Sequence, residues 1–114
     1  MSLFQLARGG RKIVHSGITA TVTGTPEEAK DNNAMILFCD ITGSGTWTIK
    51  IQVQSVSSTW MDMYDQNGNL MAISSMTSDK AQLFVGIPKY FRIVGTEDSG
   101  TATMTTIAYE LFSV

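Results

Sequence analysis

Hydrophobic and polar residues alternate most regularly in the stretch Thr46–Val53. Hydrophobic residues take every second position from Trp47 to Val53, and threonine, lysine and glutamine stand between them. Side chains on a β-strand point alternately to its two faces, so the pattern predicts a strand with one apolar and one wet face. The pair Ser44-Gly45 indicates a turn just before it. We expect this to be the central strand of an all-β domain whose other strands cover its apolar face.

Shorter stretches of the same kind recur along the chain, with turn signals after roughly every 8–14 residues. About seven or eight short strands are expected on this spacing, in Ile18–Gly24, Ala34–Ile41, Thr46–Val53, Trp60–Tyr64, Leu70–Ile73, Gln82–Val85, Lys89–Val94 and Thr101–Phe112. Crossover helices do not fit between them, which favours an antiparallel β-sandwich or jelly roll over a parallel sheet.

Four segments carry more specific expectations. Ala34–Ile41 is continuously apolar, as in a strand that is buried on both faces or passes between partners. Glu27–Asn33 is polar and predicts either an exposed loop or a single helical turn. Asn67-Gly68 suits the positive φ angles of a type I′ hairpin. Gly95–Gly100 is interpreted as another hairpin loop.

The first 17 residues differ from the rest of the chain, and we expect an N-terminal arm over residues 1–17 and a sandwich domain over residues 18–114. The arm has apolar residues followed by a glycine-rich basic stretch, which makes it a candidate for docking on its own domain or on a neighbouring subunit. Its candidate binding residues are Leu3, Phe4, Leu6, Arg8, Arg11 and Lys12.

Charge is scarce and unevenly distributed. Charged residues make up 16% of the 114 residues, below the roughly 25% usual for soluble domains. All ten acidic residues follow Pro26, whereas three of the eight basic residues precede it. The net charge of −2 makes nucleic acid an unlikely partner. Two interpretations fit the low fraction of charged residues. The domain is either a Thr-rich sheet in solution or a protein with part of its surface buried against a partner.

Cys39 is the only cysteine, so no intrachain disulfide is possible. Its place in an apolar run predicts a buried, inert thiol. The chain's start lacks the basic region and long apolar core of a signal peptide. No apolar run approaches the roughly 20 residues of a membrane helix, so no membrane partner is expected.

Catalytic and metal-binding patterns are weak, and we expect no enzyme activity, no cofactor and no metal. His15 is the only histidine and lies in the expected arm, without the partners that a catalytic triad needs. Asp62, Asp65, Asn67 and Asn69 supply oxygen atoms around one hairpin. Their spacing does not match a calcium-binding EF-hand loop, and ordinary turn chemistry accounts for them.

Exposed aromatic rings form the remaining candidate site. A sugar ring stacks on a planar side chain that has polar neighbours, and Trp60 and Tyr64 are the candidate residues. The competing interpretation places both tryptophans, Trp47 and Trp60, in the core.

The order of these segments along the chain is similar to that of a known class of proteins. A Thr-rich strand (Gly45–Val53) is followed by Ser58-Thr-Trp-Met-Asp-Met-Tyr64, an Asn-Gly turn, Tyr90-Phe-Arg-Ile-Val94 and Ser99-Gly-Thr-Ala-Thr103. This resembles the small β-sandwich proteins of tailed-bacteriophage virions, either head-decoration (cement) proteins or fibre and tail accessory proteins. The resemblance covers roughly residues 40–110 and brings no active-site residues with it.

What the resemblance implies is a structural protein of the virion. Decoration proteins of this class sit as homotrimers on the capsid and clamp neighbouring major capsid subunits, which an apolar and basic arm would suit. The expected partners are therefore the major capsid protein or other virion proteins, and the expected location is the virion. The alternative is a carbohydrate- or receptor-binding sandwich of a phage tail or fibre. A domain of a bacterial surface protein is the third interpretation.

Overall fold

A computed structural model describes residues 11–114, and in this part of the chain every regular element is a β-strand. The strands are β1 (Lys12–Ile18), β2 (Val22–Thr23), β3 (Glu27–Glu28), β4 (Ala34–Thr42), β5 (Gly45–Gln54), β6 (Trp60–Asp62), β7 (Ala72–Met76), β8 (Lys80–Val85), β9 (Tyr90–Gly100) and β10 (Thr103–Phe112). Within residues 11–114 there is accordingly no helix that could span a membrane.

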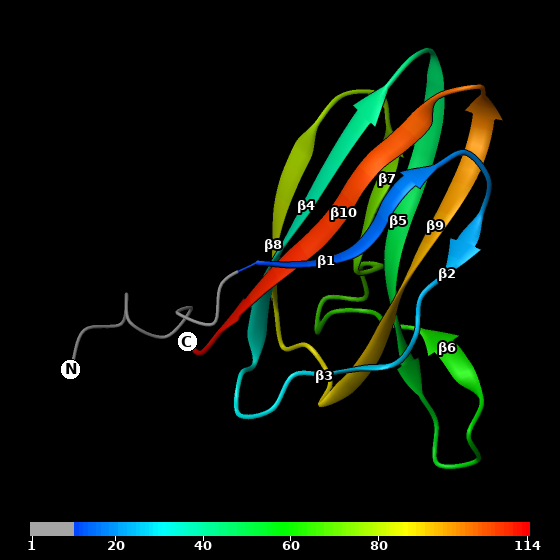
Figure 1. Cartoon of the computed structure of the whole chain (residues 1–114). Helices are drawn as coiled ribbons and strands as arrows, with labels where there is room; N and C mark the ends of the chain where they lie inside the picture. Colours follow the sequence, from blue (N-terminus) through cyan, green and yellow to red (C-terminus); the bar gives the residue numbers. More distant parts are fainter. Residues whose placement is uncertain (1–10) are drawn as a thin grey trace.

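The strands form two antiparallel sheets that pack face to face (Figure 1). Sheet A has the order β1-β10-β4-β8, and sheet B has the order β2-β9-β5-β6, with β3 also pairing with β9 and β7 with β5. The expected all-β sandwich is confirmed. The described residues contain more strands than the expected seven or eight, partly because β2 and β3 are only two residues long.

The stretch with the most regular alternation is the central strand of sheet B. β5 pairs with β9 along one side and with β6 and β7 along the other. Trp47, Ile49 and Ile51 of β5 are completely buried against the inner face of sheet A. The Trp47 indole Nε1–H donates to the Ala102 carbonyl at 3.0 Å, so the largest core side chain has its polar group satisfied. Trp47 therefore belongs to the core, as expected.

The chain crosses between the sheets at two glycines that touch each other. The chain turns between the end of β4 and Gly45, the first residue of β5. It turns again after Gly100, the last residue of β9, and then enters β10. These glycines are paired across the sheet, and Gly100 has φ +79°. A Cβ atom on Gly100 would lie 2.5 Å from the Gly45 Cα, so a side chain there would require the backbone to move. Ser44-Gly45-Thr46 and Ser99-Gly100-Thr101 are thus side by side at this crossing.

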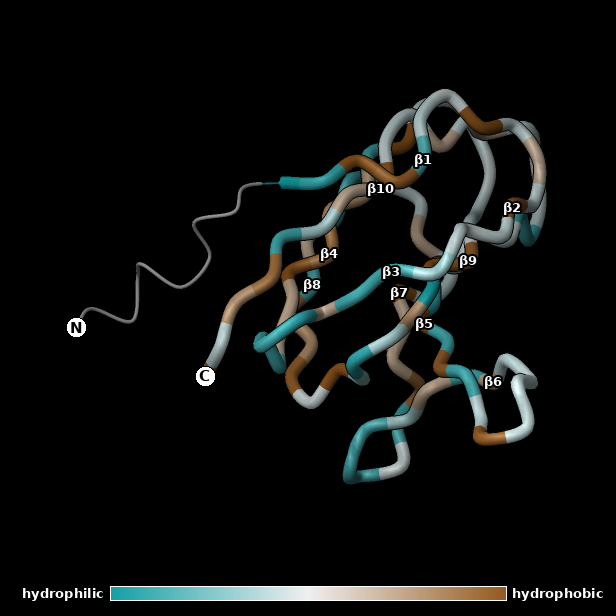
Figure 2. Tube along the Cα trace, turned by 60° about the horizontal axis from the view of Figure 1, so that its bottom comes forward, coloured by the Kyte–Doolittle hydropathy of each residue, from teal (hydrophilic) through white to brown (hydrophobic). Residues whose placement is uncertain are grey.

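Part of the expected arm belongs to the sandwich. Residues 12–17 lie in β1, which pairs with β10 from Lys12↔Tyr109 to Ile18↔Met104. Figure 2 shows why: the hydrophilic beginning of this strand is followed by hydrophobic residues next to β10. Val14 and Ile18 pack against the core, which gives this segment a reason to pair. The domain boundary expected at residue 17 thus falls inside a strand, and residues 1–10 lie outside the described part.

The strand expected over Ile18–Gly24 is divided, because β1 ends at Ile18 in sheet A and β2 (Val22–Thr23) belongs to sheet B. Three further local expectations differ from the structure. Gly95–Gly100 is the second half of the long strand β9, because Gly95 lets the side chains of Ile49, Trp47 and Ile107 pack closely against its backbone. Glu27–Asn33 begins with strand β3, in which Glu27 is buried.

The Asp65–Asn69 turn is the third. Its positive φ falls on Gly68 and not on Asn67, and the Gly68 N–H donates to the Asp65 carbonyl. This geometry is a turn closed by a left-handed glycine rather than a type I′ turn.

Candidate functional site

The outer face of sheet A carries a continuous group of apolar side chains, which we call the outer patch. Met35, Leu37 and Cys39 of β4 point into the core, so the residues between them point outward. Cross-strand pairs extend this outward row to the neighbouring strands, since Ile36 pairs with Leu83. The outer patch consists of Ile13, Ile36, Phe38, Leu83, Val85 and Phe112.

Much of the outer patch is open to solvent. Leu83 is 52% exposed, Val85 50% and Ile13 60%, while Ile36, Phe38 and Phe112 are half-buried. In a soluble monomer, exposed apolar residues are normally spread singly over the surface. A contiguous group of them on one sheet face indicates a binding surface for another molecule. The apolar run Ala34–Ile41 was expected to be buried on both faces or to pass between partners. Within the described chain, one of its faces is buried and the other lies in the outer patch.

Arg11 lies on this same face. Its guanidinium sits 3.9 Å from the centre of the Phe38 ring, and its Nε–H donates to the Glu110 carboxylate at 3.0 Å. Both contacts are partly exposed, so each adds little to stability. Together these two contacts fix the position of Arg11, the first described residue, over the outer patch. Of the expected arm residues, Arg11 is the one that the structure places there, whereas Leu3, Phe4, Leu6 and Arg8 lie outside the described residues.

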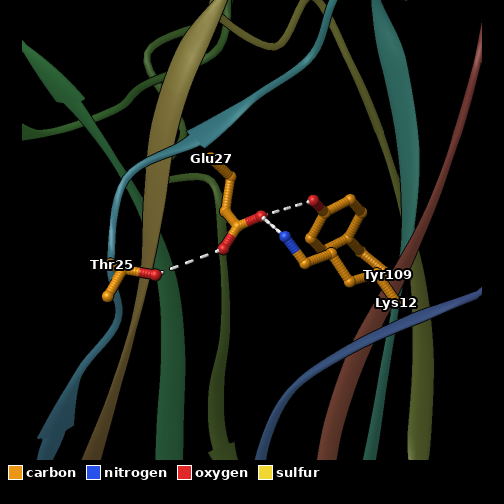
Figure 3. Close-up of polar contacts among 4 residues, drawn as sticks. All are labelled: Lys12, Thr25, Glu27 and Tyr109. Carbon is orange, nitrogen blue, oxygen red and sulfur yellow. Dashed lines mark hydrogen bonds and ion pairs between the residues drawn. The ribbon is translucent and has the colours of Figure 1, made fainter.

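Lys12, the other described residue of the expected arm, points the opposite way. Its ammonium nitrogen lies 2.5 Å from the Glu27 carboxylate, which also accepts a hydrogen bond from the Tyr109 hydroxyl at 2.7 Å (Figure 3). The Thr25 hydroxyl donates to the second carboxylate oxygen at 3.5 Å. Burial first, and then the hydrogen bond to Glu27, raise the pKa of Tyr109 well above its usual value. Lys12 is therefore part of a latch between the sheets rather than a free surface charge.

Glu27 is the residue of this latch that sequence reasoning missed. It is 8% exposed and comes from β3 of sheet B, whereas Lys12 and Tyr109 come from sheet A. A glutamate in a polar stretch after Pro26 gives no signal of burial. A weak signal existed in β10, where Tyr109 is inward-facing and its hydroxyl needs an acceptor.

A groove of about 800 Å³ runs along the other border of the outer patch. One wall is residues 82–86, which contain the end of β8, and the other is the hairpin from Met63 to Ala72. The candidate residue Tyr64 lies here and is 55% exposed. Polar side chains line the hairpin wall beside it, namely Asp65, Gln66, Asn67 and Asn69. β8 pairs with β4 alone among the described strands, so its other edge faces this groove.

The Asp65 carboxylate accepts hydrogen bonds within its own turn. It accepts hydrogen bonds from the backbone N–H groups of Asn67 and Asn69, both at 2.9 Å. The hydrogen bond from Asn69 is the main cause that lowers the pKa of Asp65. The cluster of oxygen-bearing residues is thus explained by turn chemistry. Among residues 11–114, no three His, Cys, Asp or Glu side chains gather in a way that could hold a metal ion.

Trp60 is neither in the core nor beside Tyr64. It pairs with Gln54 on the wet face of β5, and the Arg92 guanidinium lies 4.6 Å from the centre of its ring. Arg92 also donates to Gln52 at 2.7 Å, and Gln52 donates to Asp62 at 2.9 Å. Arg92 thus covers one face of the indole, and the two candidate aromatic residues do not form one binding site.

His15 and Cys39 have structural surroundings. His15 Nε2 lies 3.4 Å from the Ile93 carbonyl, in a partly buried position between the sheets. Cys39 is completely buried, and this burial raises the pKa of its thiol to about 12. The two side chains are on different strands with separate contacts, which fits the expectation that Cys39 is an inert core residue.

The fold is similar to that of a solved protein structure. No family model matches the chain, and no curated protein matches it. The crystal structure of SPBc2 prophage-derived protein YomS is similar to it, with a TM-score of 0.56 and 12% sequence identity. The match covers 90% of this chain and 91% of the other. At this identity the likeness shows a shared fold over almost the whole chain, including both sheets.

Proposed function

We propose that this protein is a non-enzymatic structural protein of a phage virion, and specifically a capsid decoration (cement) protein that binds between major capsid subunits. The observation that carries the proposal is the outer patch. Exposed apolar residues from several strands of one sheet are suited to contact another protein. The prophage origin of the similar structure supports a phage protein, and the resemblance in segment order supports the decoration class.

A binding experiment tests this proposal directly. Capsids of the phage that encodes the chain are mixed with the purified protein, and the bound fraction is measured by co-sedimentation. The double variant Leu83→Ser, Val85→Ser should bind at least about tenfold more weakly, because it removes two exposed anchors from the outer patch. The matched control is Val56→Ser, which changes a fully exposed valine in the loop between β5 and β6.

The result also separates the decoration role from other virion roles. Saturable binding to capsids, lost in the outer-patch variant and kept in the control, would support the proposal. No binding to capsids, or equal binding by both variants, would contradict it. A homotrimer, which is the oligomer we propose, would give three times the subunit mass in sedimentation equilibrium.

A second candidate function rests on Tyr64. Its ring is exposed on a groove whose hairpin wall is rich in amide and carboxylate side chains, as in many sugar-binding sites. This favours the alternative of a carbohydrate- or receptor-binding module of a tail or fibre. Glycan-array binding that is lost in Tyr64→Ala would support it. The same loss in Trp60→Ala is not expected, because Arg92 already covers that ring.

A further inference from the structure

We propose that the free edge of β8 binds one extended strand of a partner protein, which pairs with β8 and so extends sheet A. The groove between β8 and the Met63–Ala72 hairpin holds this strand. The strand carries apolar side chains at every second position and a basic side chain beside Asp65. This inference goes beyond the proposed function, because it concerns the way in which a partner binds and holds for partners other than a capsid.

Three residues of β8 direct their backbone hydrogen-bonding groups away from β4. Just beyond the paired residues, the Gly86 N–H donates to the Asn33 carbonyl at 2.7 Å, so the register of the two strands continues there as a hydrogen-bonded pair. In an antiparallel ladder, such pairs alternate with pairs that exchange no hydrogen bonds. Counting back from Gly86, the pairs without hydrogen bonds to β4 contain Ala81, Leu83 and Val85. Their N–H and C=O groups therefore point to the free edge.

The Leu83 carbonyl gives separate evidence for this direction. It accepts a hydrogen bond from the Gln82 side chain at 3.4 Å, as expected of a carbonyl that is not directed at β4. Every residue of β8 except Phe84 is exposed, so the edge is accessible. An extended backbone is the ligand that satisfies such a row of groups, because its own N–H and C=O groups recur at the same spacing.

The edge of β8 lacks the features that usually protect an edge strand, which are shortness, a bulge, charge or a cover. β1, the other edge of sheet A, has an irregular register between Ile13 and His15, and its Lys12 is held by Glu27 of β3. The sheet B strands β2 and β6 have only two and three residues. β8 pairs with β4 in unbroken register over six residues, and Lys80 at its beginning is its one charged residue. It is therefore the edge best suited to accept another strand.

The groove offers contacts to both faces of an added strand. Side chains of such a strand would point alternately toward the outer patch and toward the hairpin. On the first side they would lie across from Leu83 and Val85, which are exposed and gain most from apolar cross-strand neighbours. On the second side Met63 and Leu70 line the groove. The bound strand would thus continue the outer patch by one further row.

The charge of the groove determines the charge of its occupant. Among the described residues that line the groove, Asp65 is the only one with a charged side chain. A lysine or arginine at the adjacent end of the bound strand would be attracted to this carboxylate, and a glutamate there would be repelled. The occupant is therefore neutral or basic at that end.

A second copy of the chain is a poorer occupant than a strand of another protein. Two β8 edges would pair antiparallel about a twofold axis perpendicular to the sheet, which leaves the inner faces of both copies on the same side. Each copy would bring its hairpin to that side of the junction, and with it a second Asp65 carboxylate. A single strand of a partner brings neither the second hairpin nor the like charge.

A peptide of alternating composition tests the inference on the full-length protein. The probe is the capped peptide Lys-Thr-Val-Thr-Val-Thr-Val, and its binding is followed by amide hydrogen exchange. At saturation, the N–H groups of Ala81, Leu83 and Val85 should exchange at least about tenfold more slowly. The N–H groups of Gln82 and Phe84 are the internal control, because they already face β4 and should change little.

Two methylated peptides separate strand pairing from apolar adhesion. When the valines lie across from Leu83 and Val85, their N–H groups point to β8, and the threonine N–H groups point away. Methylation of the three valine nitrogens should therefore weaken binding at least about tenfold relative to methylation of the three threonine nitrogens. Replacing the peptide lysine by glutamate should weaken binding severalfold, because of Asp65. Equal binding by the two methylated peptides, or no binding of the unmodified peptide at about 1 mM, would overturn the inference.

A variant of the edge keeps this test independent of the outer patch. Ala81→Pro removes one edge N–H and no hydrogen bond to β4, and proline is tolerated in an edge strand at such a position. Ala81→Ser keeps the N–H and is the matched control. The proline variant should bind the peptide at least about tenfold more weakly than the serine variant, because its ring also blocks the approach of a strand.

The same pair of variants distinguishes this inference from the proposed function. In co-sedimentation with capsids, loss of binding in both Ala81→Pro and the variant Leu83→Ser, Val85→Ser would support both. Full capsid binding by Ala81→Pro, with loss only in the serine double variant, would overturn strand pairing and leave the decoration role in place. A dimer of the purified protein that Ala81→Pro dissociates would also overturn the inference, because it would make a second copy the occupant.

Discussion

Replacing Glu27 by alanine should lower the free energy of unfolding by about 2–4 kcal/mol. Most of this cost falls on Tyr109, whose buried hydroxyl would lose its acceptor, at about 1–3 kcal/mol. The Lys12 contribution is small, about 0–1 kcal/mol, because the lysine side chain is 61% exposed and its charge can return to water. The remainder comes from the Thr25 hydrogen bond and from packing around β3.

Thermal and urea denaturation give the magnitude. For a domain of this size, 1 kcal/mol corresponds to a shift of about 4 °C in Tm, so Glu27→Ala should lower Tm by about 8–16 °C. The matched control is Glu28→Ala, which removes an exposed carboxylate from the next position of the same strand and should change Tm by less than about 2 °C.

A double-mutant cycle decides whether the reasoning is right. In Glu27→Ala, Tyr109→Phe the orphaned hydroxyl is gone, so the double variant should be more stable than the sum of the two single losses predicts, by about 1–2 kcal/mol. Strictly additive losses would refute the assignment of the cost to the Tyr109 hydroxyl. A stability of Glu27→Ala equal to that of the control would refute the role of the latch altogether.

Three further predictions follow from single side chains or turns. The raised pKa of Tyr109 means that the unfolded chain releases this proton near pH 10 while the folded protein retains it, so stability should fall as the pH rises above about 10. Urea denaturation between pH 8 and 11 should show a flatter profile in Tyr109→Phe. Gly68→Ala should cost about 1–2 kcal/mol for its positive φ alone. Gly100→Ala should cost about 3 kcal/mol or more, because its Cβ would also collide with Gly45; equal losses of Tm in the two glycine variants would contradict the close approach. Cys39 should resist iodoacetamide at pH 8 in the folded protein and react after denaturation, and rapid labelling of the native state would contradict its burial.

Alternation along single strands was the most informative feature of the sequence. The pattern of Thr46–Val53 correctly predicted which face of β5 is buried, because a strand in a two-layer sandwich has one core face and one wet face. The same reasoning correctly predicted the burial of Trp47, and the continuous apolar run around Cys39 correctly predicted the burial of its thiol. It left Trp60 open between the core and an exposed site, and the structure places its partner on β5 on the outward face. Whether a side chain of a short strand points inward or outward depends on the strand's register with its neighbour. Three residues are too few to predict that register.

The remaining features could not be predicted because they depend on contacts between residues that are far apart in the sequence. Glu27 is buried because Lys12 and Tyr109 approach it from the opposite sheet, and its own neighbours in sequence give no sign of them. Gly95 was interpreted as a turn residue, whereas its missing side chain makes room for core residues. The outer patch arises from residues on all four strands of sheet A, so it becomes visible only once their registers are known.

The pairing of β1 with β10 has a consequence for how the protein is made on the ribosome. β10 is synthesised after β1 to β9, yet in sheet A it lies between β1 and β4. Until it emerges, β1 has no neighbour in sheet A, β4 has an open edge, and Glu27 lacks the Tyr109 hydroxyl. A chain that stops before Thr103 therefore cannot complete either the sheet or the latch. Prematurely terminated products should stay unfolded and open to proteolysis, so that only complete chains persist.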